Sequence, residues 1–373
     1  MRVVPPDKSM AFARAPLRVG LAGGGSDLPS FAHRFGGMVV NFAINRFVTA
    51  GCWIEKSRIE SVESNLQEER TSLAIDTDFP PHQSRMSIAE GTIQWFKSHG
   101  YVGDVGLVLK HMSQVGPGSG LGGSSTATVA CFSAVAQFLG REFGRREVAE
   151  ATMTIEREIC GIPGGIQDFF PAIAGGFRLI KTQGLRDFHD EPIHISQSLF
   201  SWLSESLFIV PLGNRPRDMN LVVSQNNRMK DKQNSIVAGH AVKELAGIAV
   251  RALSTEDIQT LELVISGSWE AKRDFAPGTT TEEMQEIREI CLGNGALAVK
   301  VAGAGGGGHL VGLVEPSNRH KIATALNKTG QVFSAIRPEE RGVAAWTVQQ
   351  AQFGHPEEFF RREAKRSFRS LSL

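Results

Sequence analysis

The chain has 373 residues, enough for two domains, and 41% of them are hydrophobic, enough for a sizeable core. Its 40 Lys and Arg nearly balance 39 Asp and Glu, which gives no electrostatic reason to expect binding to nucleic acid or to an acidic membrane. The four cysteines show no C-x-x-C spacing, and neither a membrane span nor a signal peptide is evident, so we expect a cytoplasmic protein with buried, free thiols.

The first half of the chain mixes extended and helical segments. The apolar run at residues 17–22 predicts a strand that enters a tight turn of three glycines. The later elements lack the strict strand–helix alternation of a doubly wound sheet, so we expect an α+β fold. The other expected strands are 38–45, 47–53 and 105–109, and the expected helices are 87–98, 124–139 and 146–159.

The second half indicates a change of subdomain near residue 185. Strands are expected at 176–181 and 207–211, and the chain from 220 to 291 reads mostly helical. A strand, a glycine-rich turn, a strand, a helix at 317–327 and strands near Val332 and Ala344 follow. We therefore expect domains at 1–185 and 186–349, and a tail at 350–373 that is either a terminal helix or mobile.

The central loop is the strongest motif of the chain. It reads Pro117-Gly118-Ser119-Gly120-Leu121-Gly122-Gly123-Ser124-Ser125-Thr126 and precedes an apolar, alanine-rich run. Such a segment is typical of a loop that feeds the N-terminus of a long helix, where unpaired N–H groups and the helix dipole favour an anion. Its glycines allow close approach of a large anion, so the loop predicts a phosphate cradle.

Three other interpretations of this loop are weaker. Gly118, Gly120 and Gly123 match the dinucleotide pattern G-x-G-x-x-G. A dinucleotide site of a nicotinamide-dependent oxidoreductase needs a strand running straight into the first glycine and a second strand after the helix. Here residues 113–117 intervene, and another helix is expected to follow. No Lys follows the glycines, so the loop is not a Walker A loop, and a plain turn before a helix remains the structural alternative.

Two further glycine clusters flank the central loop. The first, Gly23-Gly24-Gly25-Ser26-Asp27-Leu28-Pro29, follows the strand that carries Arg18. The second, Gly303-Ala304-Gly305-Gly306-Gly307-Gly308, lies between two apolar runs and predicts a turn between strands where a ligand can approach closely.

Two carboxylates and three histidines have structural alternatives to a functional role. Asp168 follows a Gly- and Pro-rich break, and taken alone it is well explained as the N-cap of a helix that begins at Phe169. Glu156 lies near the end of the expected helix 146–159, where a solvated charged face is the alternative. The histidines at 33, 111 and 309 show no spacing suited to a metal site.

The three glycine motifs, in this order, resemble those of the GHMP kinases. The central loop is similar to that family's Pro-x-x-x-Gly-Leu-Gly-Ser-Ser motif, and the segment from Gly23 to Pro29 is most similar to the branch that acts on D-glycero-D-manno-heptose 7-phosphate. Galactokinases carry a Glu-His pair where this chain has Gly24-Gly25. The resemblance implies a ribosomal-protein-S5-like N-terminal domain and a ferredoxin-like C-terminal domain, and it does not cover the tail beyond Gln350.

The same resemblance implies an ATP- and Mg²⁺-dependent kinase. It would phosphorylate the anomeric C1 hydroxyl of the heptose 7-phosphate to the 1,7-bisphosphate, which feeds nucleotide-activated heptose for capsule or lipopolysaccharide. Its partners would be the sugar phosphate and ATP, with no nucleic acid and no membrane, and a homodimer is left open. Alternatives are another anomeric sugar kinase, similar to L-fucokinase, and a sensor that binds sugar and ATP without turnover. The presence of both Asp168 and Arg18 argues against a sensor.

The resemblance also assigns roles to residues. Asp168 would accept the hydroxyl proton, and Arg18 would hold it ionised and stabilise developing negative charge, although a strand arginine can also face solvent. Ser124 and Glu156 would bind Mg²⁺, with the Ser125 hydroxyl as an alternative. The nucleotide would contact Pro117, Gly118, Ser119, Gly120, Leu121, Gly122, Gly123, Ser124 and Ser125. The sugar would contact Gly24, Gly25, Ser26, Asp27, Gly305 and Gly306.

A phosphate on the sugar would need a cationic clamp. Arg215 and Arg217 follow an expected strand end and could fork onto a phosphate, so we expect them to bind it. Less specific cations follow in the helical region, at Arg228, Lys230, Lys272 and Arg273.

Overall fold

The first sheet is built around two long antiparallel strands, β1 (Ser9–Ala22) and β2 (Gly37–Ile54). The computed structural model describes residues 9–54, 59–64, 71–73, 86–102, 106–212, 221–349 and 355–369. Within these residues the sheet has eight strands, in the order β12-β1-β2-β5-β3-β4, and β6 and β7 extend it beside the first part of β2. The other strands are β3 (Ile59–Ser64), β4 (Thr71–Leu73), β5 (Leu107–Ser113), β6 (Phe177–Thr182), β7 (Phe188–Ile193) and β12 (Ala344–Gln349).

The segments expected as two strands at 38–45 and 47–53 form the single strand β2. Its first part pairs with β6 and its second part with β5, while β1 pairs along both parts. The register against β1 shifts between Pro16 and Leu17, opposite the polar residues Asn45 and Arg46. This irregularity absorbs the break in the apolar pattern without ending the strand.

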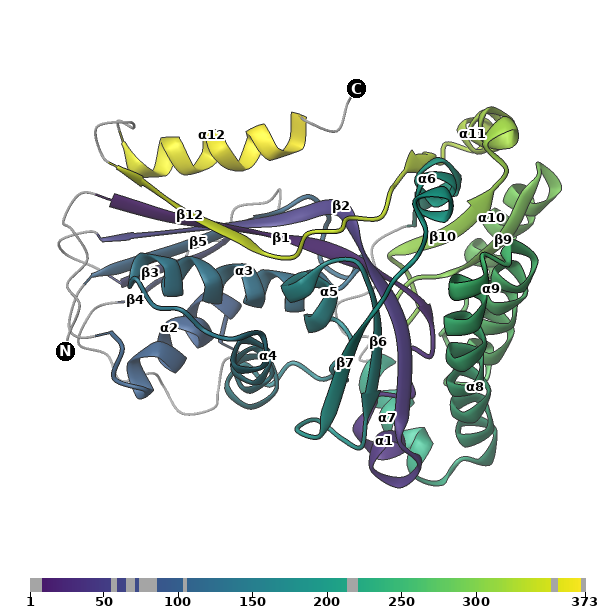
Figure 1. Cartoon of the computed structure of the whole chain (residues 1–373), viewed down its shortest axis with the longest axis horizontal. Coiled ribbons are helices and arrows are strands. Elements are labelled where there is room, and N and C mark those ends of the chain that lie inside the picture. The colour runs from purple at the N-terminus through teal and green to yellow at the C-terminus, as the bar shows by residue number, and fades with distance from the viewer. Residues whose placement is uncertain are drawn as a thin grey trace.

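Helices cover both faces of this sheet (Figure 1). One face carries α2 (Ile88–Ser98), α3 (Gly123–Phe138), α4 (Arg145–Met153) and α5 (Phe169–Ala174). The other carries α12 (Pro356–Arg369), so the tail, which was left open, contains a helix. Phe360 of α12 stacks on Phe12, and Glu357 pairs with Lys110 at 3.1 Å, which fixes the helix to β1 and β5.

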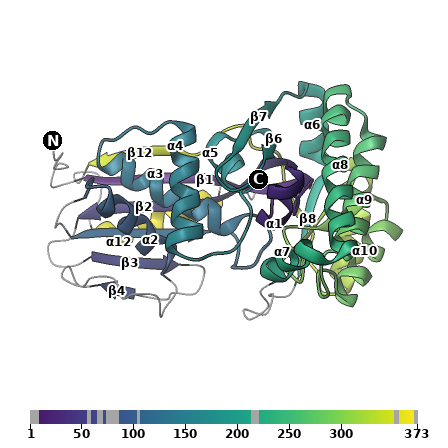
Figure 2. The same ribbon diagram turned by 90° about the horizontal axis from the view of Figure 1, so that it is seen from below.

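The second sheet is antiparallel, in the order β11-β8-β10-β9, and it has the strand–helix sequence of a ferredoxin-like fold. Its strands are β8 (Leu207–Pro211), β9 (Ala296–Val301), β10 (His309–Val314) and β11 (Ser334–Ala335). Between β8 and β9 come α7 (Leu221–Asp231), α8 (Gln233–Thr255), α9 (Ile258–Arg273) and α10 (Glu282–Gly293). The remaining helices are α1 (Pro29–Phe35), α6 (Gln197–Ser206) and α11 (Arg319–Lys328). The two sheets lie side by side along the long axis (Figures 1 and 2).

Strand pairing carries the first sheet beyond the boundary expected near residue 185. β7 pairs with β6, and β12 returns from the second sheet to pair with β1. The division at 185 and 349 into separate folding units therefore stays a prediction. In the part of the chain that the structure describes, no helix combines the length and apolar content needed to cross a membrane.

Candidate active site

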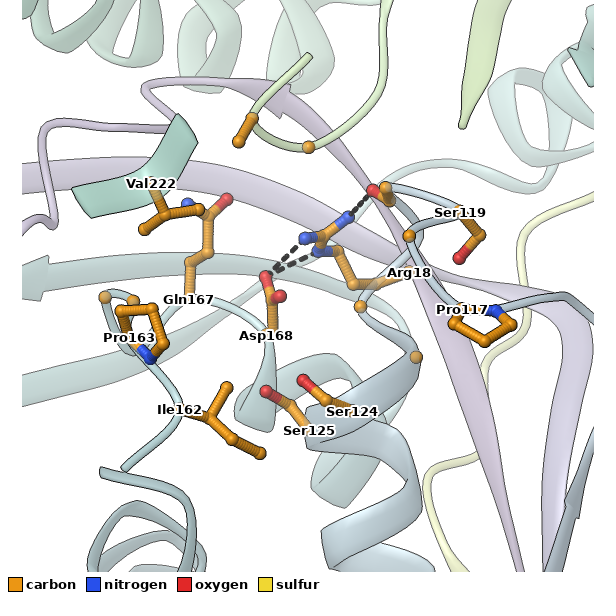
Figure 3. Close-up of a pocket in the computed structure, with 18 of the residues that line it drawn as sticks. Arg18, Pro117, Ser119, Ser124, Ser125, Ile162, Pro163, Gln167, Asp168 and Val222 are labelled. Atoms are coloured by element: carbon orange, nitrogen blue, oxygen red, sulfur yellow. Dashed lines mark hydrogen bonds and ion pairs between the residues drawn. The ribbon is translucent and has the colours of Figure 1, made fainter. Parts of the chain in front are cut away.

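A cavity of about 740 Å³ lies between the two sheets and is reached by all three glycine-rich segments. Its lining comes from the ends of β1, β5 and β9, the first turn of α3, the break before α5, and the ends of α7 and α9. Figure 3 shows Asp168 and Arg18 at its centre, with Ser119 and Pro117 on one side and Gln167 and Val222 on the other.

The buried Arg18 and the partly exposed Asp168 form an ion pair at the centre of the cavity. Arg18 Nε and Nη2 both lie 2.6 Å from Asp168 Oδ1, and Nη1 donates to the Gly120 carbonyl at 2.5 Å (Figure 3). The Arg18 side chain is 5% exposed and that of Asp168 is 22% exposed. No described residue hydrogen-bonds Asp168 Oδ2, so this oxygen is available to a ligand.

The structural alternatives for this pair are wrong. Arg18 is buried rather than facing solvent. Asp168 does precede α5, but its side chain makes no capping hydrogen bond to the helix, because Arg18 holds the carboxylate.

Glycine is required at Gly122 to let Arg18 pass. Gly122 is the N-cap of α3 in a left-handed conformation, with φ of 78°. A Cβ atom there would come within 3.0 Å of Arg18 Cγ. The central loop therefore presents the first turn of α3 to the cavity and also positions the arginine.

The third glycine cluster packs against the central loop. Gly308 packs against Gly118, Gly303 packs against Gly120, and His309 Nδ1 lies 2.8 Å from the Ser119 carbonyl. Burial lowers the pKa of His309, which keeps the ring neutral in its supporting role.

Eight of the nine residues expected to contact a nucleotide line the cavity, and Leu121 does not. The Leu121 side chain is fully buried in the core, and its carbonyl accepts the Arg18 backbone N–H at 3.0 Å. The alternation of glycines with a core residue anchors the loop while its backbone stays open to the cavity.

Glu156 is fully buried, so a solvated helical face is the wrong interpretation of it. A π-helical turn, η1 (Thr154–Ile159), continues α4 and directs Glu156 inward, while Glu158 pairs with Arg186 at the surface. Ser125 donates to Glu156 Oε2 at 2.7 Å, and Arg157 pairs with the same oxygen at 3.1 Å. The structure thus joins Ser125, rather than the expected Ser124, to Glu156.

Carboxylate and hydroxyl oxygens near the start of α3 are ligands of the kind that Mg²⁺ takes, although Glu156 lies behind the cavity lining rather than in it. Glu156 Oε1 is buried without a hydrogen-bond partner, and the Ser124 side chain is exposed at the cavity wall. The described residues contain no cluster of three or more His, Cys, Asp or Glu that could hold a metal. An ion here would therefore complete its coordination with phosphate oxygens and water, as Mg²⁺ commonly does.

Asp27 fastens two loops together. Its carboxylate accepts hydrogen bonds from the backbone N–H groups of Ile166, Gln167 and Gly25 and from the Gln167 amide, at 2.8 to 3.2 Å. Burial raises the pKa of the Asp27 carboxyl, and the nearby Asp168 charge adds to this effect, while backbone N–H groups of Gln167 and Gly25 act in the opposite direction. These contacts tie the first glycine turn to the segment that presents Asp168.

Gly24 and Gly25 line the cavity as expected, whereas Ser26 does not. The Ser26 side chain is fully buried and donates within its own turn, to Gly23 and Met38 carbonyls. The turn needs its glycines, since Gly25 has φ of 104° and a Cβ there would collide with Phe275.

The other residues expected at the sugar fall elsewhere. Gly305 and Gly306 pack on Thr279 outside the cavity lining, which Gly303 and Ala304 supply instead, because the turn curls back toward α10. Arg215 and Arg217 lie outside the described residues.

Two cations of the lining escaped the sequence analysis. Arg157 donates to the Ile162 and Gly165 carbonyls, at 3.0 and 2.6 Å, and so braces the break before Asp168. Lys300 is a buried charge in the otherwise apolar strand β9, as Arg18 is in β1. Lys272, noted above as a less specific cation, also lines the cavity.

Two sequence models of one family match separate parts of the chain, and both parts contribute residues to the cavity lining. The sequence model of the GHMP kinases N terminal domain matches residues 87–176, which include the central loop and Asp168. The model of the GHMP kinases C terminal domain matches residues 249–332, which include Lys272, Lys300 and the third glycine cluster.

Individual relatives match over most of the chain. D-glycero-alpha-D-manno-heptose 7-phosphate kinase of Campylobacter jejuni is 28% identical, over 90% of this chain and 98% of that protein. L-fucokinase/L-fucose-1-P guanylyltransferase of Bacteroides fragilis is 23% identical, over 81% of this chain but only 34% of that protein. The crystal structure of a D-glycero-D-manno-heptose 1-phosphate kinase from Bacteroides thetaiotaomicron superimposes with a TM-score of 0.73 at 25% identity, over 91% of this chain and 99% of that one.

Proposed function

The chain belongs to the GHMP kinases and is a sugar kinase of that family, and from this premise we propose that it transfers the γ-phosphoryl group of ATP to the anomeric hydroxyl of D-glycero-D-manno-heptose 7-phosphate. The observation that carries the proposal is the ion pair between the buried Arg18 and the partly exposed Asp168, which lies between the first turn of α3 and the first glycine turn. Phosphoryl transfer needs a phosphate cradle, charge stabilisation and a proton acceptor, and these three parts meet there.

Asp168 accepts the proton of the anomeric hydroxyl through Oδ2, the oxygen that Arg18 leaves open. A bond forms between the hydroxyl oxygen and the γ-phosphorus, the bond from that phosphorus to the β,γ-bridging oxygen breaks, and ADP leaves. Arg18 pairs with Asp168 through Oδ1 and is near enough to offset negative charge that develops on the phosphoryl oxygens.

The nucleotide phosphates lie along the central loop. Gly118, Gly120 and Gly122 have φ of 75°, 76° and 78°, a left-handed backbone conformation that residues other than glycine rarely adopt. The N–H groups at the start of α3 have no partner within the helix and point toward the bound anion.

Glu156 and the hydroxyls of Ser124 and Ser125 would hold Mg²⁺ beside this loop. When bound, the ion neutralises phosphate charge and orients the phosphates for in-line transfer. Arg157 forms an ion pair with Glu156. It also donates a hydrogen bond to the Gly165 carbonyl, which joins the π-helical turn to the break before Asp168.

A heptose phosphate is the best-supported acceptor because the match to the Campylobacter jejuni enzyme spans nearly all of both chains, while the fucokinase match spans about a third of its relative. The product would be the 1,7-bisphosphate, made in the cytoplasm for nucleotide-activated heptose of capsule or lipopolysaccharide. An anomeric kinase for an unphosphorylated sugar is the competing function.

An ADP-release assay over a sugar panel tests the proposal. The acceptors are heptose 7-phosphate, free heptose, mannose, fucose and galactose, each with ATP and Mg²⁺ and each repeated with an Asp168→Asn control. We expect fastest release with heptose 7-phosphate and loss of that release in the control. If ADP release is faster with free fucose than with heptose 7-phosphate, fucose is the better candidate for the substrate. If no sugar accelerates ADP release over the reaction without sugar, the protein is not a sugar kinase.

A further inference from the structure

Two lysines from distant parts of the chain meet at the cavity wall. Lys272, near the end of α9, and Lys300, in β9, are 7% and 4% exposed and both line the cavity. Lys300 Nζ donates to the Leu21 carbonyl at 2.8 Å, and Lys272 Nζ donates to the Gly303 carbonyl. We propose that Lys272 and Lys300 bind the phosphate group that the sugar substrate itself carries, an assignment that rests on the proposed function.

Positive charge exceeds negative charge around Lys300. Lys300 makes no ion pair with any acidic side chain in the described parts of the chain, and Asp168 pairs with the neighbouring Arg18. Burial lowers the pKa of Lys300 well below its ordinary value, and the charges of Lys272 and Arg18 lower it further. A buried cation that faces two others is costly unless an anion joins them, and a phosphate dianion would do so.

Lys300 also has N–H donors left for a ligand. An ammonium group has three N–H donors, and the hydrogen bond from Lys300 to Leu21 uses one of them. The side chain lines the cavity, so its other donors are placed to meet a ligand there. The two lysines present point charges held in place by backbone carbonyls, a suitable arrangement for a phosphate group.

The two lysines lie near the first glycine turn, where the sugar is expected to bind. Leu21 immediately precedes the first glycine turn, whose Gly24 and Gly25 line the cavity. Lys272 lies one helical turn before Phe275, the ring that packs against Gly25. The nucleotide phosphates already have the backbone of residues 117–125 and α3, so the lysines supply a second phosphate site in the same cavity.

Lysine-to-methionine variants at 272 and 300 test this assignment, because methionine keeps the length and apolar stem of the side chain. The readout is the ratio of kcat/KM for heptose 7-phosphate to kcat/KM for free heptose. We expect each variant to lower this ratio about 10- to 150-fold, the value of a charge-assisted contact. Lys243→Met is the matched control, since Lys243 also donates to a backbone carbonyl, that of Phe35, but lies outside the cavity lining, and its ratio should match wild type.

The outcomes separate this inference from the proposed function. Turnover of both sugars with equal losses in the variants would assign the lysines to the transferred phosphoryl group and overturn the inference while leaving the kinase intact. If the wild type turns over neither sugar, calorimetric titration with heptose 7-phosphate and with inorganic phosphate decides. Binding that weakens in Lys300→Met and Lys272→Met but not in Lys243→Met would support the site without the proposed reaction, and equal binding in all variants would overturn it.

Discussion

At the start of α3 the cavity is lined by a single segment, residues 117–125 apart from Leu121, whereas the lining around the first glycine turn comes from β1, α7, α9, β9 and the break before α5. At the first end the backbone does the binding, and glycine is needed for its conformation at several positions. At the second end side chains carry the charge, and the backbone holds them through carbonyl groups such as those of Leu21 and Gly303. The first end should therefore be sensitive to any added Cβ atom, and the second to the loss of particular side chains.

The largest expected effect comes from the residue between the two ends. Asp168→Asn keeps the shape of the side chain but removes the proton acceptor, so kcat should fall about 10²- to 10⁴-fold while ATP affinity is retained. Asp190→Asn is the control, because Asp190, 17% exposed, also pairs with a buried arginine, Arg178, but through both carboxylate oxygens and away from the cavity. Steady-state kinetics with near wild-type kcat for Asp168→Asn would remove Asp168 from the chemistry.

The backbone end is tested by Gly122→Ala. Its Cβ would press on Arg18, and because small displacements of catalytic groups are costly, we expect a loss of kcat/KM on the order of 100-fold. Gly140→Ala is the control, since Gly140 has a similar φ of 61° but no atom within 4 Å of the added Cβ. Both variants should lose about 1–2 kcal/mol of stability by thermal unfolding. Equal activity of the two variants would show that Gly122 acts only as the N-cap of α3 and does not position Arg18.

The metal requirement is tested by Glu156→Gln. Replacing a buried carboxylate with a neutral amide should raise the Mg²⁺ concentration for half-maximal rate by about 10-fold or more. Glu158→Gln, two residues away and paired with Arg186 at the surface, should leave it as in wild type. An unchanged Mg²⁺ titration in Glu156→Gln would limit Glu156 to its contacts with Ser125 and Arg157.

The smallest expected effect is on the pH dependence of stability. Because burial raises the pKa of Asp27, the folded protein holds this proton in a range, from about pH 4 upward, where the unfolded chain has released it. The free energy of unfolding should then fall as pH rises from the unfolded pKa to the folded one. Urea unfolding of Asp27→Asn should show a shallower decline than wild type over this range. A steeper decline in the variant would mean that the N–H donors around Asp27 dominate and hold its pKa low.

Sequence patterns predicted the end of the cavity that is local in the chain. The run of small residues before α3 was sufficient to place the central loop. The role of Arg18 came from the family resemblance, and its otherwise apolar strand argued only against a solvent-facing side chain. The family motifs supplied Asp168, which on local grounds alone was as well explained by a helix cap.

The sugar end was harder because its contacts join residues far apart in sequence. The sequence around Ser26 does not show that its hydroxyl donates to the Met38 carbonyl. The sequence around Gly305 does not show that this residue packs on Thr279, outside the cavity lining. Lys300 is a charge within an apolar strand, and that pattern could have singled it out. The inward turn of Glu156 depends on a π-helical turn, which helical periodicity does not predict.

The central claim, transfer to the anomeric hydroxyl with Asp168 as proton acceptor, is tested most directly by phosphorus NMR of the product. Wild-type protein, ATP, Mg²⁺ and heptose 7-phosphate should give a new phosphorus signal coupled to the anomeric proton, formed in equal amount with ADP. The same mixture with Asp168→Asn should take about 10²- to 10⁴-fold longer to reach that amount. Transfer to a different hydroxyl of the heptose, seen as coupling of the transferred phosphorus to another proton, or an equal rate in the variant, would contradict the account.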